Sequence, residues 1–186
     1  MEAYDDAREM LQTGRRGLVG VLAGTAWISW GLITARAFTP LVLAALGSAA
    51  GFLLAGCGYC VIQGSRVRPT EDRSRRGLNK GLLLVLLLEG AGVGVVVFAA
   101  QKTGRLDLLP VWIGMVIGLH FFALAEVFRL PRYRFLGAAI TAWCVLAWIL
   151  FRGNSLTVAV GLGTGAILWS ATLLFLFRVL ENRIKM

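Results

Sequence analysis

Residues 81–101 read GLLLVLLLEGAGVGVVVFAAQ, an apolar run in which Glu89 is the only charged residue. A run of this length crosses the hydrocarbon core of a bilayer as a helix, which takes about 20 apolar residues. The helix is required because lipid cannot satisfy free backbone N–H and C=O groups, and the run lacks the alternation of a barrel strand. This stretch therefore predicts an integral membrane protein.

Five further apolar runs of similar length lie elsewhere in the chain of 186 residues. The expected spans are about 17–34, 38–62, 81–101, 108–128, 133–151 and 156–177. Apolar residues make up 58% of the chain and charged residues 16%, whereas soluble domains carry about 45–50% and about 25%. Disorder, a coiled coil and an ordinary soluble enzyme are thereby excluded. We expect an all-α fold, a polytopic transmembrane bundle of six helices built from three helical hairpins, as a single integral membrane domain over 1–186.

The polar segment 1–14 precedes the first run. Its apolar residues recur at helical spacing: Ala3, Tyr4, Ala7, Met10 and Leu11. We expect a short amphipathic helix over about 2–12 that ends at Gly14. This helix would lie at the membrane interface, or the segment would be a frayed tail in water. No cleavable signal peptide is apparent, so the first apolar run serves as the insertion signal.

Lys and Arg are divided unevenly between the two sides that six spans create. Fifteen of the 19 lie in the N-terminal segment, the second and fourth loops and the C-terminal tail. The other side has only Arg36, Lys102, Arg105 and Arg152. The positive-inside rule then predicts a multi-pass protein of the inner (plasma) membrane with both termini in the cytoplasm. The net charge of +9 favours anionic phospholipids at the cytoplasmic face as partners, and not nucleic acid, because the basic residues cluster between apolar runs.

Residues 25–50 align without gaps with residues 141–166. The matched positions include Thr25-Ala26-Trp27 with Thr141-Ala142-Trp143, and Arg36 with Arg152. Both stretches begin on the predicted inner side, so the alignment predicts an internal parallel repeat of helical hairpins.

Glycines four residues apart occur in five of the six runs. The pairs are Gly20/Gly24, Gly47/Gly51, Gly90/Gly94, Gly114/Gly118 and Gly161/Gly165. Small residues at this spacing let helix backbones approach closely, so we expect these stripes to face neighbouring helices. The alternative is that a glycine-rich run unwinds to line a site. A homo-oligomer is a further partner that the sequence allows.

Two ionisable residues, Glu89 and the single histidine His120, lie well inside their runs. Each is about eight residues from the inner end of its run, or roughly 12 Å at 1.5 Å per residue. Thr25, Thr141 and Ser170 have the same depth. Charges inside a bilayer are costly and mark either a site or a paired contact. Two interpretations stay open: a site for a proton, a cation or a small solute, or a polar pair that holds two helices together.

Cys57-Gly58-Tyr59-Cys60 has the spacing of a thiol redox pair or of two metal ligands. No second such pair or nearby histidine completes the site in the sequence, so packing is the favoured role, and no metal or cofactor is predicted. The sequence also lacks an HExxH motif and a nucleophile elbow. Their absence weighs against an enzyme without excluding one.

The chain resembles uncharacterised small six-span bacterial membrane proteins through Gly118-Leu119-His120-Phe121-Phe122 and the following Pro131-Arg132-Tyr133. Its length, its hairpin repeats and the Arg15-Arg16 step before the first span are also loosely similar to HdeD-type acid-resistance membrane proteins. Arg36-Ala37-Phe38-Thr39-Pro40 departs from the Asn-Pro expected at that family's outer turn. The resemblance implies a six-helix membrane architecture and supplies no reaction.

From these patterns we expect a proton- or cation-linked transporter or channel for a small solute. The alternative is a non-catalytic membrane protein that binds lipid or a partner in a stress response.

The charge distribution makes a direct prediction about topology. In a chain without its native cysteines, Ser74→Cys should react with an impermeant maleimide from the cytoplasmic side, and Thr103→Cys from the opposite side. Comparing the labelling of intact cells with that of opened cells shows from which side each cysteine reacts. Reaction of both positions from one side would contradict the six-span topology.

Overall fold

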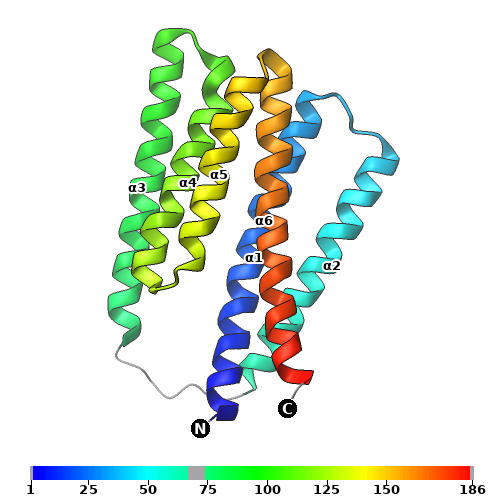
Figure 1. Cartoon of the computed structure of the whole chain (residues 1–186), viewed down its shortest axis with the longest axis vertical. Coiled ribbons are helices and arrows are strands. Elements are labelled where there is room, and N and C mark those ends of the chain that lie inside the picture. Colours follow the sequence, from blue (N-terminus) through cyan, green and yellow to red (C-terminus); the bar gives the residue numbers. More distant parts are fainter. Residues whose placement is uncertain (1, 67–73, 185–186) are drawn as a thin grey trace. The chain divides into compact units, whose positions relative to one another are not determined.

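Six long α-helices make up nearly all of the structure, a computed structural model that describes residues 2–66 and 74–184 (Figure 1). The helices are α1 (Glu2–Thr34), α2 (Pro40–Ser65), α3 (Ser74–Thr103), α4 (Leu109–Phe128), α5 (Arg132–Leu150) and α6 (Gly153–Ile184). A 3-10 helix, η1 (Leu106–Leu108), precedes α4. This confirms the all-α fold expected from the sequence.

Each long helix contains a segment with the length and hydropathy to cross a membrane. These segments are Met10–Thr34, Pro40–Ser65, Gly81–Thr103, Leu106–Phe128, Arg132–Leu150 and Gly153–Glu181. They agree with the six runs of the sequence to within a few residues, except at the start of the first run. The protein is therefore a multi-pass integral membrane protein. The three-hairpin arrangement and the internal repeat stay predictions.

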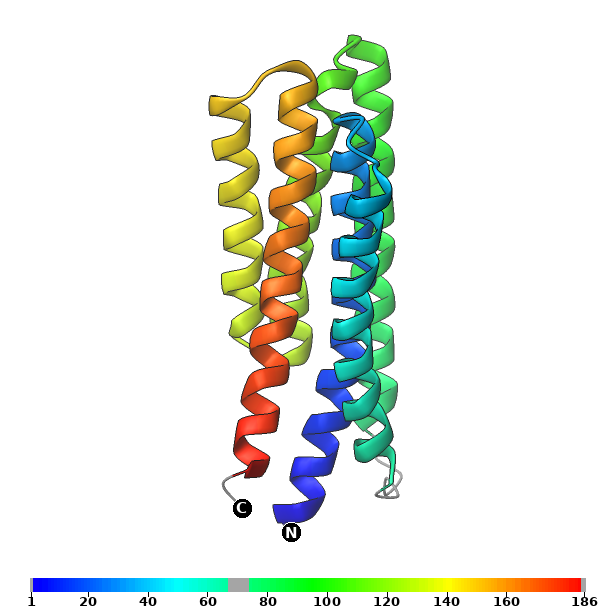
Figure 2. The same cartoon turned by 90° about the vertical axis from the view of Figure 1, so that its right-hand side faces the viewer.

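The helix ends follow from local chemistry. Thr39 caps α2, because its side-chain oxygen accepts a hydrogen bond from the backbone N–H of Val42 at 3.3 Å, and Pro40 occupies the first turn. Arg129 adopts the left-handed conformation after α4, with φ of 52°. The turn between α5 and α6 is short (Figure 2), and there Gly153 supplies a positive φ of 54° that a side chain would oppose.

The helices form two compact units. The first contains Met1–Trp27, Ala37–Thr70 and Gly165–Met186, and the second contains Ile28–Arg36 and Glu71–Thr164. Helices α1 and α6 are each divided between the two units, α1 after Trp27 and α6 before Gly165.

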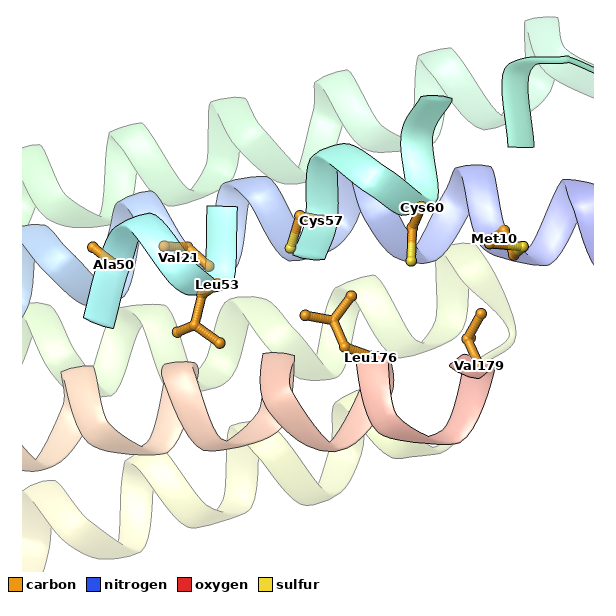
Figure 3. Close-up of a cluster of buried hydrophobic side chains, with 8 residues drawn as sticks. All are labelled: Met10, Val21, Ala50, Leu53, Cys57, Cys60, Leu176 and Val179. Atoms are coloured by element: carbon orange, nitrogen blue, oxygen red, sulfur yellow. The ribbon is translucent and has the colours of Figure 1, made fainter. Parts of the chain in front are cut away.

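A glycine face on α1 brings the helices of the first unit into close contact. A methyl group added at Gly14 would lie 2.7 Å from the carbonyl oxygen of Cys57 on α2. One added at Gly24 would lie 2.5 Å from the Trp169 ring on α6, whose Nε1 donates to the Val21 carbonyl at 3.2 Å. The buried residues between the helices form one cluster (Figure 3): Met10, Val21, Ala50, Leu53, Cys57, Cys60, Leu176 and Val179.

The sequence led us to expect that a short helix ends at Gly14, and this expectation is wrong. α1 is continuous from Glu2 to Thr34 and passes through Gly14. Glycine in a helix interior costs about 1 kcal/mol relative to alanine. Here its missing side chain permits the contact with α2, which offsets that cost. The interfacial position of the first residues stays a prediction.

The second unit uses glycines in the same way between α4 and α5. A methyl group added at Gly137 would lie 2.6 Å from the Gly118 carbonyl, and one added at Gly118 would collide with the Thr141 hydroxyl. Between α5 and α6, the Trp143 ring covers Gly163, and its Nε1 donates to the Ala159 carbonyl at 3.0 Å. Close packing of this kind is one of the interactions that hold helices together in lipid, beside interhelical hydrogen bonds.

Two of the five glycine pairs do not face a neighbouring helix, and for them the expectation is wrong. Methyl groups added at Gly47, Gly51, Gly90 or Gly94 would meet nothing within 4 Å. These pairs lie on α2 and α3, whose spans are the least buried of the six. Lipid solvates an apolar surface as well as protein does, so composition alone does not distinguish the lipid-facing side of a helix.

This contrast predicts how glycine substitutions act. Gly118→Ala should destabilise the protein by about 1–3 kcal/mol, because the new methyl group overpacks the α4–α5 contact. Gly47→Ala should be neutral or slightly stabilising, because it adds helix propensity without a contact. Thermal unfolding of the purified protein in detergent measures both. Equal loss of stability would show that the two faces are packed alike.

Candidate functional site

The two ionisable groups expected inside the membrane meet between α3 and α4. Nδ1 of His120 lies 3.1 Å from Oε2 of Glu89. The His120 side chain is 10% exposed and that of Glu89 is 26% exposed, so the imidazole is the more enclosed partner. The imidazole also interacts with the backbone of Val85, one turn before Glu89. The proximity expected from their equal depth is therefore confirmed.

The register of two antiparallel helices explains why these residues meet. Gly81 of α3 packs against Val127 of α4, with 3.3 Å between an added methyl group and the valine side chain. Gly92 packs in the same way against Val116, at 3.1 Å. The step of eleven residues from Gly81 to Gly92 along α3 therefore matches the step of eleven residues from Val127 back to Val116 along α4. Glu89 and His120 lie between these two contacts, at matching heights.

The contact is electrostatic in character and not a directed hydrogen bond. Within the described part of the chain, Nδ1 of His120 has no partner aligned for hydrogen bonding despite its short distance to the carboxylate. The ring stands edge-on to Phe121, with 5.8 Å between ring centroids, and Phe121 stacks on Tyr133 of α5 at 5.9 Å. The aromatic neighbours therefore restrict the orientation of the ring.

The three hydroxyl residues predicted at the same depth do not join this pair through any contact that the structure describes. Thr25 donates to the Val21 carbonyl of its own helix at 2.7 Å, and Ser170 is exposed on α6. Thr141 packs against Gly118. Gly118 is two residues from His120, and two residues rotate a helix by about 200°, so Thr141 meets the other side of α4.

Buried threonines form a second polar feature that sequence reasoning did not find. Thr13, Thr164 and Thr172 are at most 5% exposed. Thr172 donates to the Leu168 carbonyl at 3.0 Å, and Thr164 interacts with the thiol of Cys144. Threonine is common in membrane helices and bonds readily to its own backbone, so its sequence position carries no clear indication of burial.

Among the described residues, no group of three or more His, Cys, Asp and Glu side chains could hold a metal ion. The candidate site is the Glu89–His120 pair.

The pair should show energetic coupling if its members depend on each other. Glu89→Leu and His120→Leu should each destabilise the protein by about 1–3 kcal/mol, because each leaves a polar group in the span without its partner. The double variant should lose less than the sum, because replacing both partners removes the unpaired group. Denaturation of the four proteins in the same detergent measures the coupling. Strictly additive losses would show that the groups are independent.

Chemically, a carboxylate and an imidazole in contact can bind and release a proton inside a span. Histidine is the side chain whose charge changes most readily near neutral pH, and each proton bound changes the net charge of the pair by one unit. A charge at this depth costs about 2.5–3.5 kcal/mol even on lenient scales, so protonation has a large energetic effect. No protein-family model, curated protein or solved structure matches the chain.

Proposed function

We propose that this integral membrane protein is a small proton- or cation-linked transporter or channel, with Glu89 and His120 as the residues that bind the proton or cation. The observation that supports this most is the 3.1 Å contact between two ionisable side chains, each within a segment able to span the membrane. Ionisable residues inside transmembrane helices characteristically mark pathways for ions and protons.

The different exposure of the two partners supports the same proposal. Glu89 is 26% exposed, and the next residue, Gly90, borders open space. The carboxylate is therefore the less enclosed member of the pair. His120 is more enclosed and provides the second position for the proton. A pair with one open and one enclosed member allows stepwise transfer.

The arginines around the α4–α5 turn support a cytoplasmic orientation for that end of the second unit and anionic phospholipids as its partners. Arg129 ends α4, and Arg132 and Arg134 lie in the first turn of α5. Nη2 of Arg134 pairs with Oε1 of Glu126 at 2.5 Å, yet both side chains are more than half exposed. Basic residues at this level attract acidic headgroups by about 1 kcal/mol each.

Proton movement can be measured directly in liposomes that contain the purified protein and a trapped pH-sensitive dye. The wild-type protein should dissipate an imposed pH gradient, and Glu89→Gln should abolish this flux because an amide cannot exchange the proton. Glu126→Gln is the matched control, because Glu126 is 69% exposed at the end of a span and its loss should leave the flux unchanged.

A wild-type protein that moves neither protons nor small cations would contradict the proposal. The pair would then be a structural contact between α3 and α4. The remaining function would be that of a non-catalytic membrane protein that binds lipid or a partner, with a stress response as one setting.

A further inference from the structure

The atoms around the Glu89–His120 pair determine which ion the pair can bind. Hard metal cations need several oxygen ligands, about six for magnesium and about six to eight for calcium. The pair supplies one carboxylate and one imidazole. Within the part of the chain that the structure describes, no third His, Cys, Asp or Glu side chain joins them in a group that could hold a metal ion. A metal cation at the pair would therefore need ligands from the backbone or from hydroxyl groups.

The backbone of α3 and α4 does not supply those ligands. Cation sites in membrane transporters use the carbonyl groups of unwound helix segments. Here α3 is continuous from Ser74 to Thr103 and α4 from Leu109 to Phe128, so both helices pass the pair without a break. The glycine-rich run 90–94, for which unwinding was an alternative, is helical. Carbonyl groups inside a continuous helix already accept the hydrogen bond of the residue four positions on.

Hydroxyl groups do not complete a cation site at the pair either. Thr25 donates its hydroxyl to the Val21 carbonyl of its own helix, and Ser170 is exposed on α6. Thr141 packs against Gly118, on the other side of α4 from the imidazole. None of the contacts described for these three residues involves the pair, so its donor set remains one carboxylate and one imidazole.

We propose that the ion bound by Glu89 and His120 is a proton, to the exclusion of sodium, potassium and divalent metal cations. This inference rests on the proposed transporter or channel function and narrows its substrate. A proton needs only two acceptor atoms, and Oε2 and Nδ1 are 3.1 Å apart, close enough to share a proton once the side chains align. Two bare lone pairs at that distance repel each other, so the contact is attractive only when one of the two atoms carries a proton.

The charge balance of the pair agrees with a proton. A carboxylate beside an imidazolium and a carboxylic acid beside a neutral imidazole both have no net charge, and they differ only in the position of one proton. A divalent ion beside one carboxylate would leave a net positive charge inside the span, which is costly. On proton binding, an O–H or N–H bond forms at the pair and a hydronium ion becomes water. On release, the same bond breaks and water accepts the proton.

The single histidine of the chain allows binding to be measured without transport. In purified full-length protein that carries isotope-labelled histidine, the nitrogen NMR signals of His120 report its protonation as the pH changes. The titration midpoint should be the same in sodium, potassium, magnesium and N-methylglucamine chloride at equal ionic strength. A metal cation that competed with the proton would move the midpoint by about one pH unit for each tenfold rise in its concentration above its dissociation constant. Such a shift would overturn the proposal.

A pair of matched variants tests whether the two side chains act together. Glu89→Gln removes the charge and keeps the shape, so it should move the His120 midpoint. Glu126→Gln is the control and should leave the midpoint unchanged, because Glu126 is 69% exposed near the end of α4 and pairs with Arg134. An unchanged midpoint in Glu89→Gln would show that the pair shares no proton. The comparison of cations in the wild-type protein needs no variant and is decisive even if Glu89→Gln does not fold.

Ion flux in liposomes separates this inference from the proposed function. With a permeant anion to balance charge, proton flux should continue at the same rate when N-methylglucamine replaces sodium and potassium. Uptake of radioactive sodium or rubidium that Glu89→Gln abolishes would overturn the proton specificity and retain the transport function. Absence of any flux would overturn the transport function, and the histidine titration would then decide by itself whether the pair binds a proton or a metal cation.

Discussion

The backbone of this protein must satisfy its own hydrogen bonds wherever lipid surrounds it. Each unpaired N–H or C=O group in hydrocarbon costs several kcal/mol, whereas a glycine inside a helix costs about 1 kcal/mol. This inequality explains why α1 continues through Gly14, Gly17, Gly20 and Gly24 without a break. Glycines, which often end helices in water, here provide surfaces for helix packing. The six helical spans follow from the same need to satisfy the backbone in lipid.

Once the helices exist, shape and polar contacts determine which of them associate, because burial of apolar surface gains little in lipid. The α4–α5 contact is close because Gly118 and Gly137 present bare backbone to each other. Among the described glycines of α3, Gly81 and Gly92 meet valine side chains of α4 instead of backbone. The packing of this helix against α4 involves the side chains of Val116 and Val127, together with the polar contact between Glu89 and His120. The pair therefore adds a polar attraction to the packing of α3 against α4.

The sequence predicts well how long each span is and how deep a residue lies in it. It predicts poorly which side of a helix faces protein and which faces lipid. The spans follow from hydropathy, and Glu89 and His120 could be paired in advance because an ionised group in a span needs a partner at its own depth. Thr25, Thr141 and Ser170 share that depth, yet none of their described contacts involves the pair. The expectation that Gly47 and Gly90 face a neighbouring helix is wrong for the same reason. The glycine spacing marks a smooth face, and nothing in an all-apolar helix shows whether lipid or protein covers it.

A structural role of the Glu89–His120 pair is compatible with the proposed proton-binding role. The attraction between a carboxylate and an imidazolium is large at low dielectric and disappears when either group becomes neutral. Gly92 against Val116 and Gly81 against Val127 are further α3–α4 contacts, one on each side of the pair. Binding or loss of one proton would therefore change how strongly α3 is held to α4. A proton-linked membrane protein requires this kind of coupling between charge and helix packing, and a purely structural pair would have the same sensitivity.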